Sequence, residues 1–197
     1  MTKVFAQASV SLDGYIAGPG GTGFDRLFAW CTAGEVETPS RQPERLTYRT
    51  NSATAAYLRE LIDETGAIVV GRRLFDVTNG WNGSHPLGTP VFVVTHQPPK
   101  DCADSDTPFS FVTEGVAVAI EQAKAVAGGK NVGIGPGSTV GQAIRAGLVD
   151  ELRVDLVPVT LGGGVRMLDG LDDGHHSFGT PRVIEGIGVT HLIYQRP

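Results

Sequence analysis

The sequence predicts an α/β protein: a mostly parallel sheet of about eight strands, flanked by about four helices. Short apolar runs alternate with segments of helical periodicity along most of the chain. Glycine follows the ends of several of these runs, at Gly14, Gly71 and Gly135. The last two strand-like runs are joined by residues 186–188, which are rich in glycine and predict an antiparallel C-terminal hairpin.

Length, composition and net charge limit which class of protein this can be and which partners it can bind. A chain of 197 residues with 41% hydrophobic residues is most simply one domain, 1–197. The net charge of -5 argues against nucleic acid or an anionic membrane as the main partner. The N-terminus lacks the pattern of a signal peptide, and no apolar run is long enough to span a membrane. Two isolated cysteines, Cys31 and Cys102, predict free thiols in a cytoplasmic protein and no metal site.

Strands are predicted where short apolar runs lie between turn-forming residues. The expected ranges are 4–10, 67–70, 90–95, 109–112, 131–134, 152–157, 181–185 and 189–195. In the range 152–157, apolar residues alternate with Arg153 and Asp155, which is the pattern of a strand with one polar face.

Helices are predicted where apolar residues recur at helical spacing, over about 25–30, 54–62, 116–127 and 138–146. The expected N-caps are Ser52 or Thr54 for the second helix, Thr113 for the third, and Ser138 or Thr139 for the fourth. Gly147 suits the end of the fourth helix. Residues 32–51 are polar and contain two prolines, so a long surface loop is expected there.

The segment 131–151 carries the main functional signal, because a strand, a glycine turn and a helix follow one another. Such a turn directs backbone N–H groups and the positive end of the helix dipole at one spot, which suits a phosphate. Gly133, Gly135 and Gly137 give GxGxG, but Val140 stands where a dinucleotide fingerprint has its third glycine. A tight turn alone explains the glycines about as well.

Other polar residues follow predicted strands. Arg72 and Arg73 come after Gly71 and form either an anion contact or an ordinary solvated pair. Asp13 and Gly14 predict a turn at a strand end, where ligands of open α/β sheets bind. A lone histidine such as His96 is more often a surface residue than a catalyst.

The order of the motifs SLDGYIAG, GRRLFD, VFVVTH, GIGPGSTVGQAIRAGLVDEL and PVTLGGG resembles the dihydrofolate reductase-like superfamily. The closer match is its branch around the C-terminal reductase domain of the bifunctional riboflavin-pathway enzyme. The resemblance runs over about residues 3–195. It rests on the order and spacing of the motifs together, and the VDEL…P…LGGG segment is the most distinctive part.

The resemblance implies an NADPH-dependent reductase, commonly a homodimer, that transfers a hydride to a small heterocyclic or imine-type acceptor. It is similar in this to 5-amino-6-(5-phosphoribosylamino)uracil reductase. The implied cofactor-binding residues are Ala8, Ile16, Gly71, Arg72, Arg73, Thr95, His96, Gly135, Gly137, Ser138, Thr139 and Val140. The implied substrate-binding residues are Ser11, Leu12, Asp13 and Glu151.

The acceptor also needs a proton, and Asp13 and Asp25 are the candidate donors, directly or through water. Glu151 has a simpler alternative as a strand-end salt bridge. Tyr15 stands where the riboflavin enzyme usually has lysine, and the deaminase domain is absent from this sequence. Two other functions therefore stay open: reduction of dihydrofolate, and a non-catalytic dimeric nucleotide-binding module.

Overall fold

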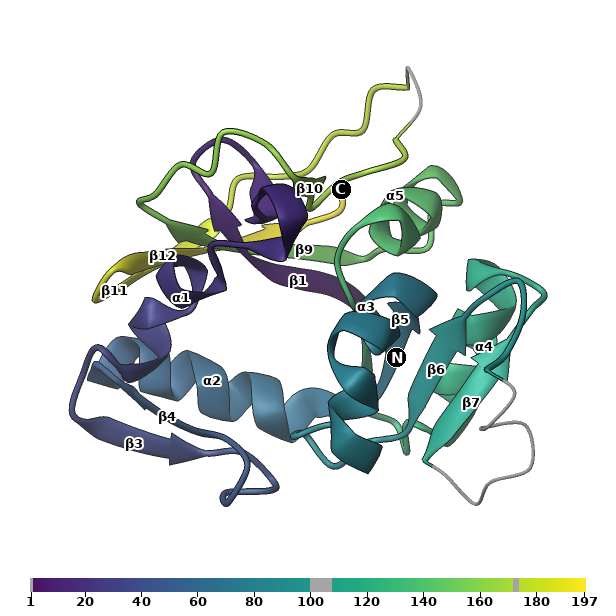
Figure 1. Cartoon of the computed structure of the whole chain (residues 1–197), viewed down its shortest axis with the longest axis horizontal. Helices are drawn as coiled ribbons and strands as arrows, with labels where there is room; N and C mark the ends of the chain where they lie inside the picture. The colour runs from purple at the N-terminus through teal and green to yellow at the C-terminus, as the bar shows by residue number, and fades with distance from the viewer. Residues whose placement is uncertain (1, 100–107, 172–173) are drawn as a thin grey trace.

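The computed structural model describes residues 2–99, 108–171 and 174–197. Its central sheet has eight strands in the order β11-β12-β9-β1-β8-β5-β6-β7 (Figure 1). In that order the strands are Arg182–Gly186, Val189–Gln195, Glu151–Val157, Val4–Ser11, Asn131–Ile134, Thr65–Gly71, Val91–Val94 and Phe109–Val112. Strand β12 is antiparallel to both of its neighbours, and all other neighbouring strands are parallel. The predicted fold class is confirmed, including the antiparallel hairpin.

Two small sheets lie outside the central one. Strand β2 (Tyr15–Ala17) pairs with β10 (Val165–Arg166), and β3 (Val36–Pro39) pairs with β4 (Thr47–Thr50). The prediction of a long loop over 32–51 is therefore wrong. The β3–β4 hairpin packs on a helix, and it buries the threonine side chains of Thr38 and Thr50 that made the segment look polar.

There are five α-helices in the described part of the chain, whereas the sequence predicted about four. They are α1 (Phe24–Leu27), α2 (Ser52–Glu64), α3 (Arg72–Val77), α4 (Val116–Val126) and α5 (Ser138–Arg145). Helix α3 was not expected, because it is a single short stretch that follows β5 without a loop. Three short 3-10 helices, Pro19–Gly21, Ala29–Thr32 and Asn79–Gly83, complete the helical structure.

The expected caps were wrong by one to three residues. Asn51 caps α2, and its side-chain oxygen accepts a hydrogen bond from the Thr54 N–H at 2.9 Å. Glycines stand at the N-cap positions of α4 and α5, Gly115 and Gly137, without a side-chain cap. Gly147 does follow α5 in the left-handed region, with φ 69°, as its position predicted.

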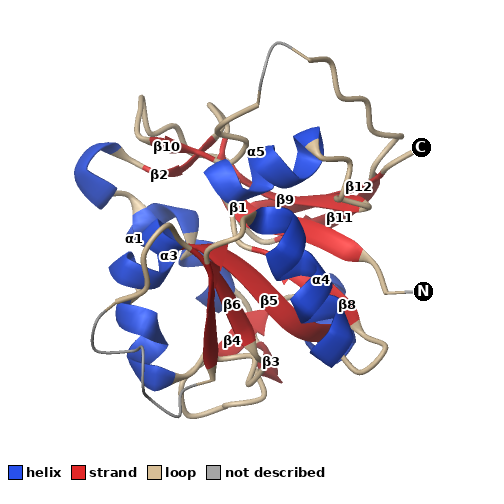
Figure 2. Cartoon of the chain, turned by 90° about the vertical axis from the view of Figure 1, so that its right-hand side faces the viewer, coloured by secondary structure: helices blue, strands red, loops and turns tan. Residues whose placement is uncertain are grey.

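Helices cover both faces of the sheet (Figure 2). Helices α4 and α5 pack on one face over a core that includes Val4, Ala6 and Val69. On the other face, α2 packs over Phe5 near one end of the sheet. Helix α3 packs near the other end, over Ile68, Val70 and Val91. Alternate residues of one strand therefore enter different cores, as the two-residue period of a strand requires.

No helix within the described ranges is long and apolar enough to cross a membrane. Cys31 is a free thiol, and Cys102 lies outside the described residues.

Candidate functional site

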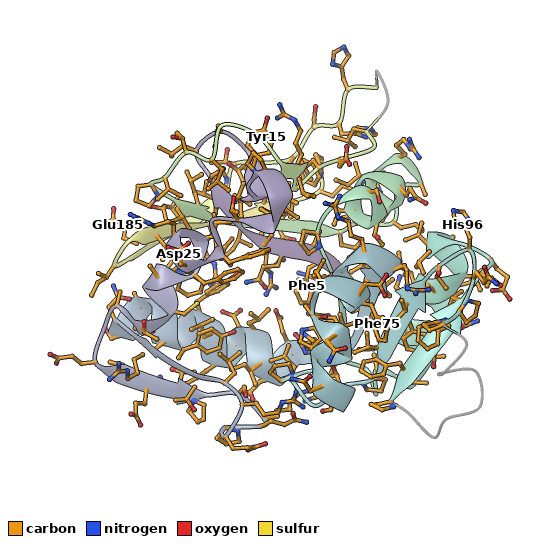
Figure 3. All side chains as sticks on the ribbon, viewed as in Figure 1. Phe5, Tyr15, Asp25, Phe75, His96 and Glu185 are labelled. Carbon is orange, nitrogen blue, oxygen red and sulfur yellow. The ribbon has the colours of Figure 1, made fainter. Side chains whose placement is uncertain are left out.

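One cavity of about 1340 Å³ lies beside the sheet and reaches the carboxyl ends of β5, β6 and β8. Parallel α/β sheets bind ligands at this edge. Its lining falls into two parts that we name by composition. The glycine-rich half comprises Gly71, Arg72, Arg73, Thr95, His96, Gly135, Gly137, Ser138 and Thr139, and the aromatic half comprises Gln7, Ser9, Phe24, Phe28, Trp30, Cys31, Tyr48 and Asp155. Figure 3 shows His96 on the right of the molecule, far from Asp25 and Glu185 on the left, with Phe5 between them.

The glycine-rich half is built by the close approach of β5 and α5. Gly137 has a φ of 99° and precedes α5, whose N-terminus has no side-chain cap. Ser138 and Thr139, the first residues of that helix, line the cavity. A Cβ atom on Gly71 would lie 2.6 Å from Thr139 Oγ1, so glycine lets the end of β5 reach the helix. This arrangement gives backbone donors and a helix N-terminus at the cavity wall, which favour an anion.

Two arginines extend the positive potential of this half. The Arg72 guanidinium is held by the Asp76 carboxylate at 2.7 Å and donates to the Gln97 carbonyl at 2.8 Å. Arg73 is exposed and makes no ion pair with a described residue. It is therefore the cation that can meet a ligand without giving up a partner in the described structure.

The aromatic half is walled by residues from α1 and the 3-10 helix that follows it. The Trp30 indole donates to Ser9 Oγ at 3.0 Å and stacks on Tyr48 with ring centroids 6.2 Å apart. Phe24 and Phe28 stack on each other at 6.3 Å and are partly exposed. Such flat apolar walls suit a planar ring.

The floor of the aromatic half is polar. The Asp155 carboxylate accepts a hydrogen bond from Gln7 Nε2 at 3.0 Å and lies 2.6 Å from His191 Nδ1. On the other side of the imidazole, His191 Nε2 lies 3.1 Å from Thr54 Oγ1. His191 is fully buried, and Asp155 is 3% exposed.

Burial and the nearby Asp155 carboxylate raise the pKa values of two neighbouring side chains. Burial first, and then Asp155, raises the pKa of the Cys31 thiol to about 12. Burial raises the pKa of Tyr48 well above its usual value, with further contributions from Cys31 and Asp155. Both groups are therefore neutral at pH 7.

The structure brings the predicted cofactor residues together. All of them except Val140 line the cavity, although they come from strands β1 and β2, the ends of β5, β6 and β8, and helices α3 and α5. Val140 is fully buried in the core between the sheet and α5. Its role as a cofactor contact stays a prediction without support from this placement.

The predicted substrate and proton-donor residues do not line the cavity. The Asp13 carboxylate accepts hydrogen bonds from Ser11 Oγ at 2.6 Å and from the Gly162 N–H at 2.7 Å. These bonds, chiefly that from Ser11, lower the pKa of Asp13 to about 2, so this carboxyl holds no proton to donate at neutral pH. Leu12 is 58% exposed, and Ser11 is buried in the turn.

Asp25 and Glu151 also lie apart from the cavity lining. The Asp25 side chain is 79% exposed and lies 3.5 Å from Arg26. Glu151 is buried and pairs with Arg153, and the Lys3 ammonium lies 3.9 Å away. The strand-end salt bridge is thus the alternative that the structure favours for Glu151.

Sequence reasoning missed Gln7, Ser9, Asp155 and His191. The alternation in 152–157 predicted a strand with one polar face, and the structure buries both Arg153 and Asp155 on it. A signal was available, because a strand between two others, with helices on both faces of the sheet, has no solvent-facing side. Polar residues in such a strand mark a buried network.

A model of the RibD C-terminal domain family matches residues 2–178. Among solved structures, a protein from Shewanella sp. PV-4 named for riboflavin biosynthesis is 24% identical, with a TM-score of 0.72 over 100% of this chain and 99% of that one. A diaminohydroxyphosphoribosylaminopyrimidine deaminase/5-amino-6-(5-phosphoribosylamino)uracil reductase from Thermotoga maritima is 13% identical, with a TM-score of 0.64. The match covers 100% of this chain and 57% of that bifunctional chain. No curated protein matched at a significant level.

A dihydrofolate reductase from Enterococcus faecalis, complexed with NADP(H), is 15% identical with a TM-score of 0.55, over 98% of this chain and 96% of that one. These likenesses show the fold, which is that of the riboflavin-biosynthesis reductases and of dihydrofolate reductase. Because the family model spans most of the chain and the sheet has the matching layout, the protein belongs to the RibD C-terminal domain family.

Proposed function

We propose that this protein is an NADPH-dependent reductase that transfers a hydride to a C=N acceptor of a small heterocycle. One observation carries the proposal: a single cavity joins a cationic, glycine-rich half to an aromatic half with a buried carboxylate. The first half suits a phosphorylated nucleotide, and the second suits a planar acceptor. Membership of the RibD C-terminal domain family supports the same reaction class.

The residues present fit the cofactor. The uncapped N-terminus of α5 offers donors for a pyrophosphate, and Gly137 leaves open space where a side chain would stand. Arg73 and His96 are both exposed at the wall of the glycine-rich half, where the Arg73 guanidinium offers positive charge to a 2′-phosphate. Ala8 and Ile16 present small and apolar surface to the cavity, as a nicotinamide ring requires.

When bound, NADPH supplies the hydride. The residues of the chain position the acceptor, because the aromatic walls fix the plane of its ring. The proton that the acceptor nitrogen takes up does not come from Asp13 in this structure, because that carboxylate is ionised and bonded to another loop.

Cofactor binding is tested by titrating NADPH and NADH into the protein and following tryptophan fluorescence. Both tryptophans, Trp30 and Trp81, line the cavity and should report occupancy. We expect NADPH to bind more tightly than NADH. The Arg73→Ala variant should lose roughly tenfold in NADPH affinity, with little change for NADH, because it loses a charge-assisted contact.

The matched control is Arg59→Ala, which removes an exposed arginine of α2 outside the cavity lining and should leave both affinities unchanged. If a folded sample binds neither nucleotide, the reductase proposal is wrong. If it binds NADPH but does not oxidise NADPH with any of the acceptors offered, the non-catalytic nucleotide-binding module becomes the better description.

The organisation of residues 1–197 as one domain, the homodimer and the cytoplasmic location stay predictions. Exposed Val183 and Ile187 on the β11–β12 hairpin supply apolar surface that a second copy of the chain could cover.

A further inference from the structure

The buried Asp155 carboxylate is placed to contact a ligand and not only to stabilise the fold. It lies at the cavity wall, and two of its lone-pair sites are taken, one by Gln7 and one by His191. A carboxylate offers about four such sites, so it keeps acceptor capacity. A buried carboxylate with unused capacity beside a cavity that can hold a ligand is more readily explained by recognition than by packing.

His191 fixes the direction of that carboxylate. With the proton on Nδ1, the imidazole donates to Asp155, while Nε2 accepts from the Thr54 hydroxyl. The ring is also held by Trp30, whose centroid lies 5.3 Å away edge-on, and by Tyr57 at 4.6 Å. Because these contacts hold the imidazole in place, its hydrogen bond holds the Asp155 carboxylate in one orientation.

The charge around Asp155 is not balanced by a basic residue of the lining. Among the described residues that line the cavity, the arginines are Arg72 and Arg73, both in the glycine-rich half, and there is no lysine. His85 lines the cavity too, but burial lowers its pKa to about 4, so it is neutral at pH 7. Arg153 lies near in sequence, but its guanidinium pairs with Glu151 and Glu64.

We propose that Asp155 is the substrate-contacting acid of the aromatic half, with His191 as its positioning residue. The matching ligand is a flat ring that carries a cationic or N–H-rich N–C–N edge and no phosphate. This inference rests on the proposed reductase function and narrows its acceptor. A carboxylate recognises two parallel N–H donors with a forked geometry, whereas it repels a phosphate in a site without cations.

The inference separates this chain from the bifunctional relative, whose name specifies a phosphoribosyl substrate. A phosphate in the aromatic half would meet Asp155 and neutral aromatic walls. Arg41, the arginine held by the Ile62 and Thr65 carbonyls near this half, does not line the cavity.

The test uses the full chain and three probes of one size: benzamidine, which is cationic and forked; benzamide, which is neutral; and phenyl phosphate, which is anionic. Their affinities are measured by calorimetry with and without saturating NADPH, whose own affinity is measured in parallel. Wild type should prefer benzamidine over benzamide, and phenyl phosphate should not compete with benzamidine for the site.

In Asp155→Asn, benzamidine affinity should fall roughly tenfold or more, with NADPH affinity unchanged, because one charge-assisted interaction is lost. The matched control is Asp63→Asn, at an exposed position of α2. His191→Asn keeps a donor near the Nδ1 position and should retain more benzamidine affinity than His191→Leu. A merely structural role for His191 would make the two variants equivalent.

Equal affinity of benzamidine for wild type and Asp155→Asn overturns the inference, as does competition by phenyl phosphate. If Asp155→Asn does not fold, the wild-type comparison decides, since equal affinities for benzamidine and benzamide also overturn it. If benzamidine binds through Asp155 but NADPH does not bind, the acidic pocket stands and the reductase proposal fails.

Discussion

Asp13 joins two loops that lie 148 residues apart in the sequence. Its carboxylate accepts from the Leu161 N–H at 3.1 Å and from the Gly162 N–H at 2.7 Å, and Ser11 supplies a third donor. These donors favour the charged form and lower the pKa of Asp13 to about 2. The residue that the sequence offered as a proton donor is therefore a clamp between the β1–β2 turn and the LGGG loop.

The clamp predicts a pH dependence of folding. The pKa of Asp13 is lower in the folded state than the value of about 3.9 expected when unfolded. Its contribution to stability is therefore complete above about pH 5 and is lost as pH falls towards about 2. We expect Asp13→Asn to unfold at lower urea than wild type at pH 7, and the difference between the two to shrink towards pH 2.

Asp63→Asn is the control, and its stability should follow wild type at both pH values because Asp63 is exposed. A difference between wild type and Asp13→Asn that stays constant from pH 7 to pH 2 would contradict this account of the clamp.

Several residues of the glycine-rich half were predictable, because the backbone conformation at their positions requires glycine. Gly71, Gly135 and Gly137 stand at strand ends, where the local sequence predicts a turn or a close approach of the backbone. The floor of the aromatic half was not predictable in this way. His191 and Thr54 are 137 residues apart, and only the pairing of β12 with β9 brings the histidine to Asp155.

Among the elements, α2 lines the cavity through Leu58, Leu61 and Ile62 and depends on its N-cap. Asn51 accepts from the Thr54 N–H, and its amide donates to the Glu185 carbonyl at 3.1 Å, which ties the helix to the edge strand. Asn51→Ala should lower the free energy of unfolding by about 1 kcal/mol. Urea unfolding followed by circular dichroism measures it.

Ser52→Ala provides the comparison, because Ser52 was one of the two caps that the sequence suggested and is exposed in the structure. We expect its effect to stay within about 0.5 kcal/mol. A larger loss in the free energy of unfolding for Ser52→Ala than for Asn51→Ala would mean that Ser52 caps the helix.

The long periodic helices and the strands of the central sheet were predictable, whereas α3, β3 and β4 were not. Helices α2, α4 and α5 repeat their apolar residues over two or more turns, which local sequence reveals. Helix α3 has six residues, and β3 and β4 have four each, so their formation depends on packing against α2 and β5. Tertiary contacts of this kind leave little trace in a window of sequence.

For the molecule as a whole, the cavity links ligand binding to folding. A cofactor that binds only the folded chain stabilises it by about 2.7 kcal/mol at 100 times its Kd. For a domain of this size, that corresponds to a rise in Tm of about 5–10 °C. We expect NADPH to produce this rise, and NADH at the same concentration to produce a smaller one.

Arg59→Ala should show the same rise as wild type, whereas Arg73→Ala should show less at that concentration. An identical rise in Tm for Arg73→Ala and wild type would mean that the Arg73 guanidinium does not contact the cofactor.

The strand order of the sheet also bears on how the protein is made. The last strand, β12, lies inside the sheet between β9 and β11, and it carries His191. The segment from β5 to α5 holds most of the glycine-rich half and leaves the ribosome long before β12 does. A nascent chain can therefore assemble the glycine turn before α5 early, whereas Asp155 has no imidazole partner until β12 has been synthesised.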